Sequence, residues 1–129
     1  MKNICVALAF TFLSGGVFAE WQKAGESGNL TIYVDTTTAR MVGSSVKLWT
    51  LSDFKKPIDG ARSIKNQVEF DCSSERMRSL FSSGFKKQMG NGDVTYTETT
   101  PLEWLPIVPG TIFEQMYTAT CDVLKNIRK

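Results

Sequence analysis

The 129-residue sequence contains no histidine, and this absence removes two common kinds of functional site. Histidine is the usual general base near neutral pH and the commonest transition-metal ligand. The Gly-x-Gly at 90–92 has neither the lysine nor the helix start of a phosphate-binding loop, so it is predicted to be a turn. We therefore predict no catalytic residues, no metal site and no cofactor.

Long apolar runs and charge of one sign are also scarce. The apolar stretch near the N-terminus is shorter than the roughly 18–20 residues that span a bilayer, so we expect no transmembrane segment. Lysine and arginine total 15 against 13 acidic residues, a formal net charge of +2. This balance does not predict attraction to a polyanion or a membrane, and no nucleic-acid recognition motif is present.

The first residues have the pattern of a secretory signal peptide. Lys2 precedes an apolar run from Ile4 to Leu13, and Val17-x-Ala19 fits a cleavage site before Glu20. We predict a leader at 1–19 and one domain at 20–129, exported to the periplasm or secreted. Cys5 lies inside the leader, without the motif of a lipidated N-terminus, so no lipid anchor is expected.

The two remaining cysteines, Cys72 and Cys121, predict a disulfide, because an even, minimal pair in an exported chain is typical of one bridge. The bridge closes a loop of about 49 residues, which the chain-entropy estimate values at about 4 kcal/mol. The alternative, a reactive thiol, needs a free cysteine in an electropositive pocket.

Alternating apolar and polar residues predict strands over 21–24, 30–35, 45–51, 64–72, 76–87 and 94–98. The clearest alternation ends at Cys72, which is expected to point into the core. Residues 53–61 are predicted to form a polar loop, because they contain Pro57 and Gly60.

The last segment predicts a helix that begins near Thr111. Thr111 and Glu114 have the spacing of a capping box, and apolar residues then recur three and four positions apart, with Cys121 among them. We predict an α+β domain in which an antiparallel sheet carries the C-terminal helix on one face, linked to it by the disulfide.

A basic row is the candidate binding face. In strand 76–87, Met77, Phe81 and Phe85 are expected to point inward and Arg76, Arg78 and Lys86 outward, with Lys65 on the neighbouring strand. Such a row suits an acidic partner such as a glycan, a lipid head group or an acidic protein segment. The alternative is a solvated face that keeps the protein soluble.

Several short motifs, in order along residues 20–129, resemble those of the surface-adhesin protein E family of small exported bacterial proteins. They include "WQK" at 21–23, "YVD" at 33–35, "VKLWTLSDF" at 46–54, "EFDC" at 69–72, "MGNG" at 89–92 and "EWLPIVPGT" at 103–111. The resemblance implies an antiparallel sheet bridged to a C-terminal helix. It also implies a non-catalytic adhesin that binds host extracellular-matrix proteins such as vitronectin and laminin.

The sequence departs from this family pattern in lacking the lipidation cysteine expected of a surface-anchored member. Two functions therefore stay open. The protein is either a binding module that reaches the cell surface, or a periplasmic structural or accessory protein that contacts another envelope protein.

Overall fold

The computed structural model describes residues 19–127, and the predicted leader and Cys5 lie outside the described residues, apart from Ala19. Its elements are seven strands, a short 3-10 helix and one α-helix. In chain order they are β1 (Gln22–Ser27), β2 (Leu30–Val42), β3 (Ser45–Ile58), β4 (Ala61–Asp71), β5 (Arg76–Phe85), η1 (Gln88–Gly90), β6 (Val94–Glu98), β7 (Leu105–Pro106) and α1 (Ile112–Ile127).

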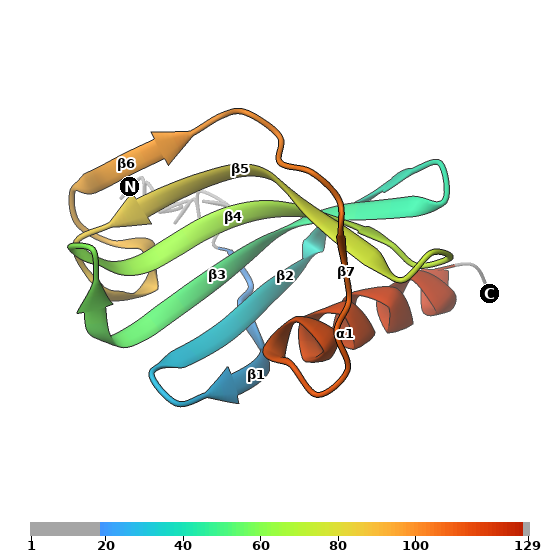
Figure 1. The fold of residues 1–129 in the computed structure, drawn as a ribbon, viewed down its shortest axis with the longest axis horizontal. Helices are drawn as coiled ribbons and strands as arrows, with labels where there is room; N and C mark the ends of the chain where they lie inside the picture. Colours follow the sequence, from blue (N-terminus) through green and yellow to red (C-terminus); the bar gives the residue numbers. More distant parts are fainter. Residues whose placement is uncertain (1–18, 128–129) are drawn as a thin grey trace, which may run out of the picture.

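The strands form one antiparallel sheet in which β1 to β6 follow their sequence order, while β7 pairs with the far end of β5. Short turns join β1 to β5 in succession, whereas the connection from β5 to β6 contains η1. Gly43 and Gly60 lie in two of these turns with φ angles of 61° and 79°, a region that favours glycine. α1 lies across one face of the curved sheet, nearest to β1 and β2 (Figure 1). The predicted fold class is confirmed.

The core lies between α1 and the sheet. Alternate residues of the central strands point toward the helix, as period-2 patterning requires. Its buried members are Ile32, Val34, Val46, Leu48, Val68, Phe70, Met77, Met116 and Cys121. Burying an aliphatic or aromatic side chain of this size contributes about 1.5–3 kcal/mol, so this cluster is the main reason that α1 packs on this face.

The predicted polar loop at 53–61 is wrong. β3 continues to Ile58, and only Asp59 and Gly60 form the turn into β4. Pro57 is tolerated because the ladder between β3 and β4 is interrupted between the Asp53 and Ile58 pairs. A proline in such an irregular segment costs no ladder hydrogen bond.

The predicted inward direction of Phe81 and Phe85 is also wrong. β5 has an irregularity in its pairing with β4, where Val68 pairs with Ser79 but Gln67 pairs with Phe81, which leaves Leu80 as an extra residue. One extra residue moves every later side chain to the other face of the sheet. Met77 therefore lies in the core, whereas Phe81 and Phe85 lie on the face opposite α1.

Candidate functional site

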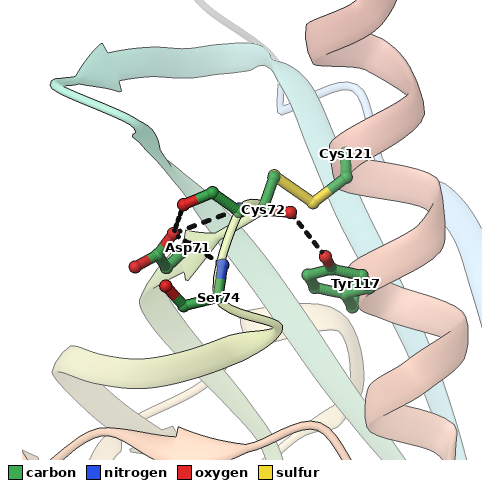
Figure 2. The surroundings of a disulfide bond; sticks show 6 residues. Asp71, Cys72, Ser74, Tyr117 and Cys121 are labelled. Carbon is green, nitrogen blue, oxygen red and sulfur yellow. Dashed lines mark hydrogen bonds between the residues drawn. A yellow bond between two sulfur atoms is a disulfide. The ribbon is translucent and has the colours of Figure 1, made fainter.

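The disulfide between Cys72 and Cys121 fixes α1 to the sheet and is confirmed. The two Cα atoms lie 5.9 Å apart, and 49 positions separate the cysteines in sequence. One turn earlier on α1, the Tyr117 hydroxyl donates a hydrogen bond of 3.0 Å to the Cys72 carbonyl oxygen (Figure 2). Burial raises the pKa of Tyr117, with Glu75 and Asp71 adding to the effect. Two links therefore hold the end of β4 against the helix.

The start of α1 carries the predicted pair Thr111 and Glu114. The Glu114 amide donates to Thr111 Oγ1 at 3.4 Å, while the Thr111 hydroxyl donates to the Val108 carbonyl at 2.7 Å. Glu114 Oε1 accepts from the Gly110 amide at 3.3 Å, one residue before the position that a standard capping box uses. Both side chains thus satisfy backbone groups at the helix start.

The sheet face opposite α1 is the candidate binding face. It is called the open face below, and it consists of the strand residues that point away from the core. Register places Arg40, Lys47, Glu69 and Arg78 in one cross-strand row. The next row contains Asp35, Trp49, Gln67 and Phe81, and the rings of Trp49 and Phe81 meet edge to face at 5.7 Å between centroids.

The guanidinium groups of Arg76 and Arg78 both stack on one indole ring at one end of the open face. Their guanidinium carbons lie 4.4 and 4.5 Å from the ring centroid of Trp104, which immediately precedes β7. Arg76 Nε lies 3.1 Å from Asp71 Oδ2, and Arg78 Nη2 lies 2.8 Å from Glu69 Oε1. Each arginine is therefore paired with a buried carboxylate on β4 while it stacks on the same indole.

Asp71 is the most strongly perturbed carboxylate of this cluster. Hydrogen bonds, first from the Ser73 hydroxyl and then from the Arg76 guanidinium and the Ser74 and Ser73 amides, lower its pKa to about 2, against an opposing effect of burial. These bonds close the turn between β4 and β5 beside Cys72 (Figure 2). The arginine pair is thus tied to the segment that carries the disulfide.

The predicted row of Arg76, Arg78, Lys86 and Lys65 is not one continuous row. Lys65 lies nearer the other end of β4, where its Nζ sits 5.3 Å from the Phe85 ring centroid. Lys86 is exposed and follows the last residue of β5. The charges of the two arginines are balanced by Asp71 and Glu69, which sequence reasoning did not foresee.

Sequence reasoning also missed two cations of the open face, Arg40 and Lys47. Within residues 19–127, neither they nor Lys65 lies within ion-pair distance of an acidic side chain. The alternation of Val46, Lys47 and Leu48 carries the signal for Lys47. Arg40 was hidden because β2 has an irregularity between Asp35 and Arg40 that interrupts the alternation.

Two structural properties of residues 19–127 concern metal binding and membrane insertion. Residues 19–127 contain no group of three or more acidic or cysteine side chains placed to bind a metal ion. Over the same residues, no helix combines the length and the apolar character needed to cross a bilayer. What the open face offers is guanidinium, ammonium and indole groups, which suit acidic or aromatic partners.

Comparison with known proteins agrees with this architecture. No curated protein sequence matches the chain. Among solved structures, protein E of Haemophilus influenzae is similar, with a TM-score of 0.64 at 13% identity over 81% of this chain and 86% of that one. A second crystal form of protein E gives a TM-score of 0.63 at 13% identity over 81% and 89%. Protein E from non-typeable Haemophilus influenzae gives 0.57 at 13% identity over 84% and 79%.

These TM-scores, at 13% identity, show a shared fold. The family itself follows from the sequence model described as "Surface-adhesin protein E", which matches residues 21–122 and so spans every strand of the sheet and most of α1. The chain belongs to the surface-adhesin protein E family.

Proposed function

We propose that the protein is an exported, non-catalytic binding module whose open face binds acidic segments of host extracellular-matrix proteins. Membership of a surface-adhesin family supports binding as the general function. The observation that carries the choice of face is the set of three unpaired cations, Arg40, Lys47 and Lys65, among the aromatic side chains of the open face.

The placement of α1 supports the same choice. The helix and the disulfide occupy the other face, so the side chains there are committed to the core. On the open face, Trp49 and Phe81 are only partly buried, and their ring faces and edges can pack against a partner. An acidic segment would gain ion pairs with Arg40, Lys47 and Lys65 and apolar contact with these rings.

Arg76 and Arg78 stabilise the open face and are not proposed to contact the partner through their charge. They hold Trp104 beside the open face and neutralise Glu69 and Asp71. Reversing either arginine to glutamate would set a third carboxylate against two buried ones, so a loss of binding in such variants would reflect damage to the fold. The unpaired cations are therefore the informative positions.

The test compares two triple variants with the same change in charge. Arg40→Gln/Lys47→Gln/Lys65→Gln removes the unpaired cations of the open face. Lys55→Gln/Lys56→Gln/Lys125→Gln removes three exposed cations that lie at the β3–β4 hairpin and on α1. Binding of the purified, exported protein to immobilised vitronectin, laminin and heparin is measured by surface plasmon resonance.

We expect the first triple variant to lose most binding and the second to keep it. Wild-type binding should also weaken as salt rises from 50 to 500 mM, because charge steering acts over about 8 Å at 0.15 M salt and over less at higher salt. Equal binding by both variants would contradict the use of the open face. Absence of binding to all three ligands would contradict the proposed partner class.

Location separates the proposal from the alternative of a periplasmic accessory protein. Intact cells are treated with protease, and the protein is then detected with an antibody. An outward-facing adhesin is degraded, whereas a periplasmic protein survives until the outer membrane is permeabilised. Survival in intact cells, together with failure to bind matrix proteins, would favour a partner within the envelope.

A further inference from the structure

A buried carboxylate on β2 forms no ion pair within residues 19–127, and Lys65, which lines the same cavity as this carboxylate, lies beyond ion-pair distance. Asp35 is 2% exposed, and within residues 19–127 no lysine or arginine lies within ion-pair distance of it. One of its oxygens, Oδ1, accepts from the Thr37 amide at 3.0 Å and from the Thr37 hydroxyl. The other, Oδ2, accepts from the backbone nitrogen of Glu20 at 3.2 Å. A buried charge is normally compensated by a charge of opposite sign, so this arrangement lacks a partner.

The nitrogen at Asp35 Oδ2 belongs to the first residue after the predicted cleavage site. In the full chain it is a neutral amide, joined to Ala19. Hydrolysis of that bond adds water across the C–N linkage, which gives a carboxylate on Ala19 and an amine on Glu20. The amine takes up a proton near neutral pH, because the ordinary pKa of an α-amino group is about 7.7–8.0.

We propose that cleavage between Ala19 and Glu20 creates the missing cation, and that the new α-ammonium group of Glu20 forms an ion pair with Asp35. Ala19 and Glu20 are both exposed, so the bond is open to a peptidase. The nitrogen already lies at hydrogen-bond distance from the carboxylate, so the pair forms without movement of the backbone. Removal of the leader thereby stabilises the folded protein.

The ion pair also fixes a part of the open face. The carbonyl of Asp35 accepts from the Thr38 hydroxyl at 2.7 Å, and Thr38 Oγ1 in turn accepts from the Trp49 amide at 3.0 Å. In the full chain a cavity of about 260 Å³ lies at this point, lined by Ala19, which cleavage removes, and by Trp21, Asp35, Thr38, Trp49 and Lys65. Anchoring Glu20 holds the neighbouring Trp21 as one wall of this cavity. The inference stands on the geometry of Asp35 and does not depend on the proposed partner.

The test is a double-mutant cycle in which every protein is expressed as the full chain and exported. One change inserts a glycine between Ala19 and Glu20, so that the processed chain carries its ammonium one residue, about 3.3–3.6 Å of extended chain, away from Asp35. The other change is Asp35→Asn. Intact mass first establishes where each processed chain begins, and urea denaturation then gives the folding equilibrium constants.

We expect the wild-type protein to begin at Glu20 and the insertion to lower its folding constant about ten- to a hundredfold, because the insertion presents a neutral amide to Asp35 in place of the ammonium group of an ion pair. In the Asp35→Asn background, the same insertion should change the folding constant less than about threefold. Asp53→Asn is the matched control. Asp53 lies on β3, on the same face of the sheet as Asp35, and accepts from the Met89 amide, away from Glu20. There the insertion should keep its full effect.

A second measurement needs no substitution at Asp35. The α-amino group of the wild-type protein should react with an amine-specific acylating reagent at least about tenfold more slowly in the native state than in urea. In the insertion variant, the native and unfolded rates should be similar. A processed chain that begins elsewhere, an insertion effect that is equal with and without Asp35, or an unprotected α-amino group would each overturn the proposal.

Discussion

Breaking the bond between Cys72 and Cys121 should remove a large part of the stability of this domain. The two cysteines are 49 positions apart, and constraining a loop of that length in the unfolded chain stabilises the folded state by about 4 kcal/mol. Domains of this size have unfolding free energies of about 5–15 kcal/mol in total. The 16-residue helix α1 would then depend on non-covalent contacts alone, because most helical stability in proteins comes from packing of the apolar face.

Urea titration of the oxidised and the reduced protein measures this effect, with far-UV circular dichroism and tryptophan fluorescence as two probes. With an m-value of about 2 kcal/mol per molar urea, a loss of about 4 kcal/mol lowers the midpoint by about 2 M. The double variant Cys72→Ala/Cys121→Ala should match the reduced wild type. Both cysteines are replaced, because a single substitution leaves a free thiol.

Dithiothreitol supplies an internal control, because it should not change the midpoint of the double variant. If the reduced wild type and the double variant both unfold within about 0.5 M of the oxidised protein, the loop-closure reasoning is refuted. If only the circular dichroism midpoint falls while the fluorescence midpoint stays, α1 has separated locally from a sheet that remains folded. That result would refute the view that the helix and the sheet form one cooperative unit.

Two further predictions concern the helix start and the turn beside Cys72. Thr111→Ala should cost about 0.5–2 kcal/mol, because it removes the hydroxyl that accepts from the Glu114 amide and donates to the Val108 carbonyl. Thr111→Ser should cost much less in the same denaturation assay, and equal midpoints for Ser and Ala would contradict the cap. Because the folded pKa of Asp71 is about 2 and its ordinary value is 3.8, the unfolded chain takes up the proton first as pH falls. The stability that this carboxylate supplies is present above pH 3.8 and is lost as pH falls toward 2, so the midpoints of wild type and Asp71→Asn should converge over this range. With the exposed Asp93→Asn as control, a gap that stays constant down to pH 2 would show that ionisation of Asp71 does not matter.

The parts of the fold that the sequence predicted are those governed by local rules. Three predicted features, namely the alternation up to Cys72, the helix start at Thr111 and the pairing of Cys72 with Cys121, each depend on a few neighbouring residues or on the number of cysteines. The disulfide further implied that α1 packs on the core face of the sheet, toward which Cys72 was expected to point. Local signals and one covalent constraint were enough to predict the fold class.

The candidate site was predicted less well, because its residues depend on pairing irregularities. The extra residue Leu80 reverses the direction of Phe81 and Phe85, although their spacing from Met77 is even. The irregularity between Asp35 and Arg40 likewise hides the register that places Arg40 beside Lys47. A β-bulge changes the face of every later residue, so residues at even spacing on either side of it, such as Met77 and Phe81, end on opposite faces.

The carboxylates opposite Arg76 and Arg78 show why composition alone misjudged the charge of this surface. The alternation in strand 64–72 places Glu69 and Asp71 on its polar side, but it does not indicate that they face Arg76 and Arg78. In the antiparallel register these residues face one another directly, and the acids are buried beneath the guanidinium groups and Trp104. An arginine whose charge is already compensated contributes shape and stacking to a surface more than long-range attraction.

The long-range attraction of an acidic partner must then come from cations whose cross-strand neighbours are not acidic, or whose nearest acid is already paired. On the open face these are Arg40, Lys47 and Lys65. Binding by this face should therefore depend on the two central strands β3 and β4, together with the end of β2, and not on the strand where the basic residues are densest in the sequence.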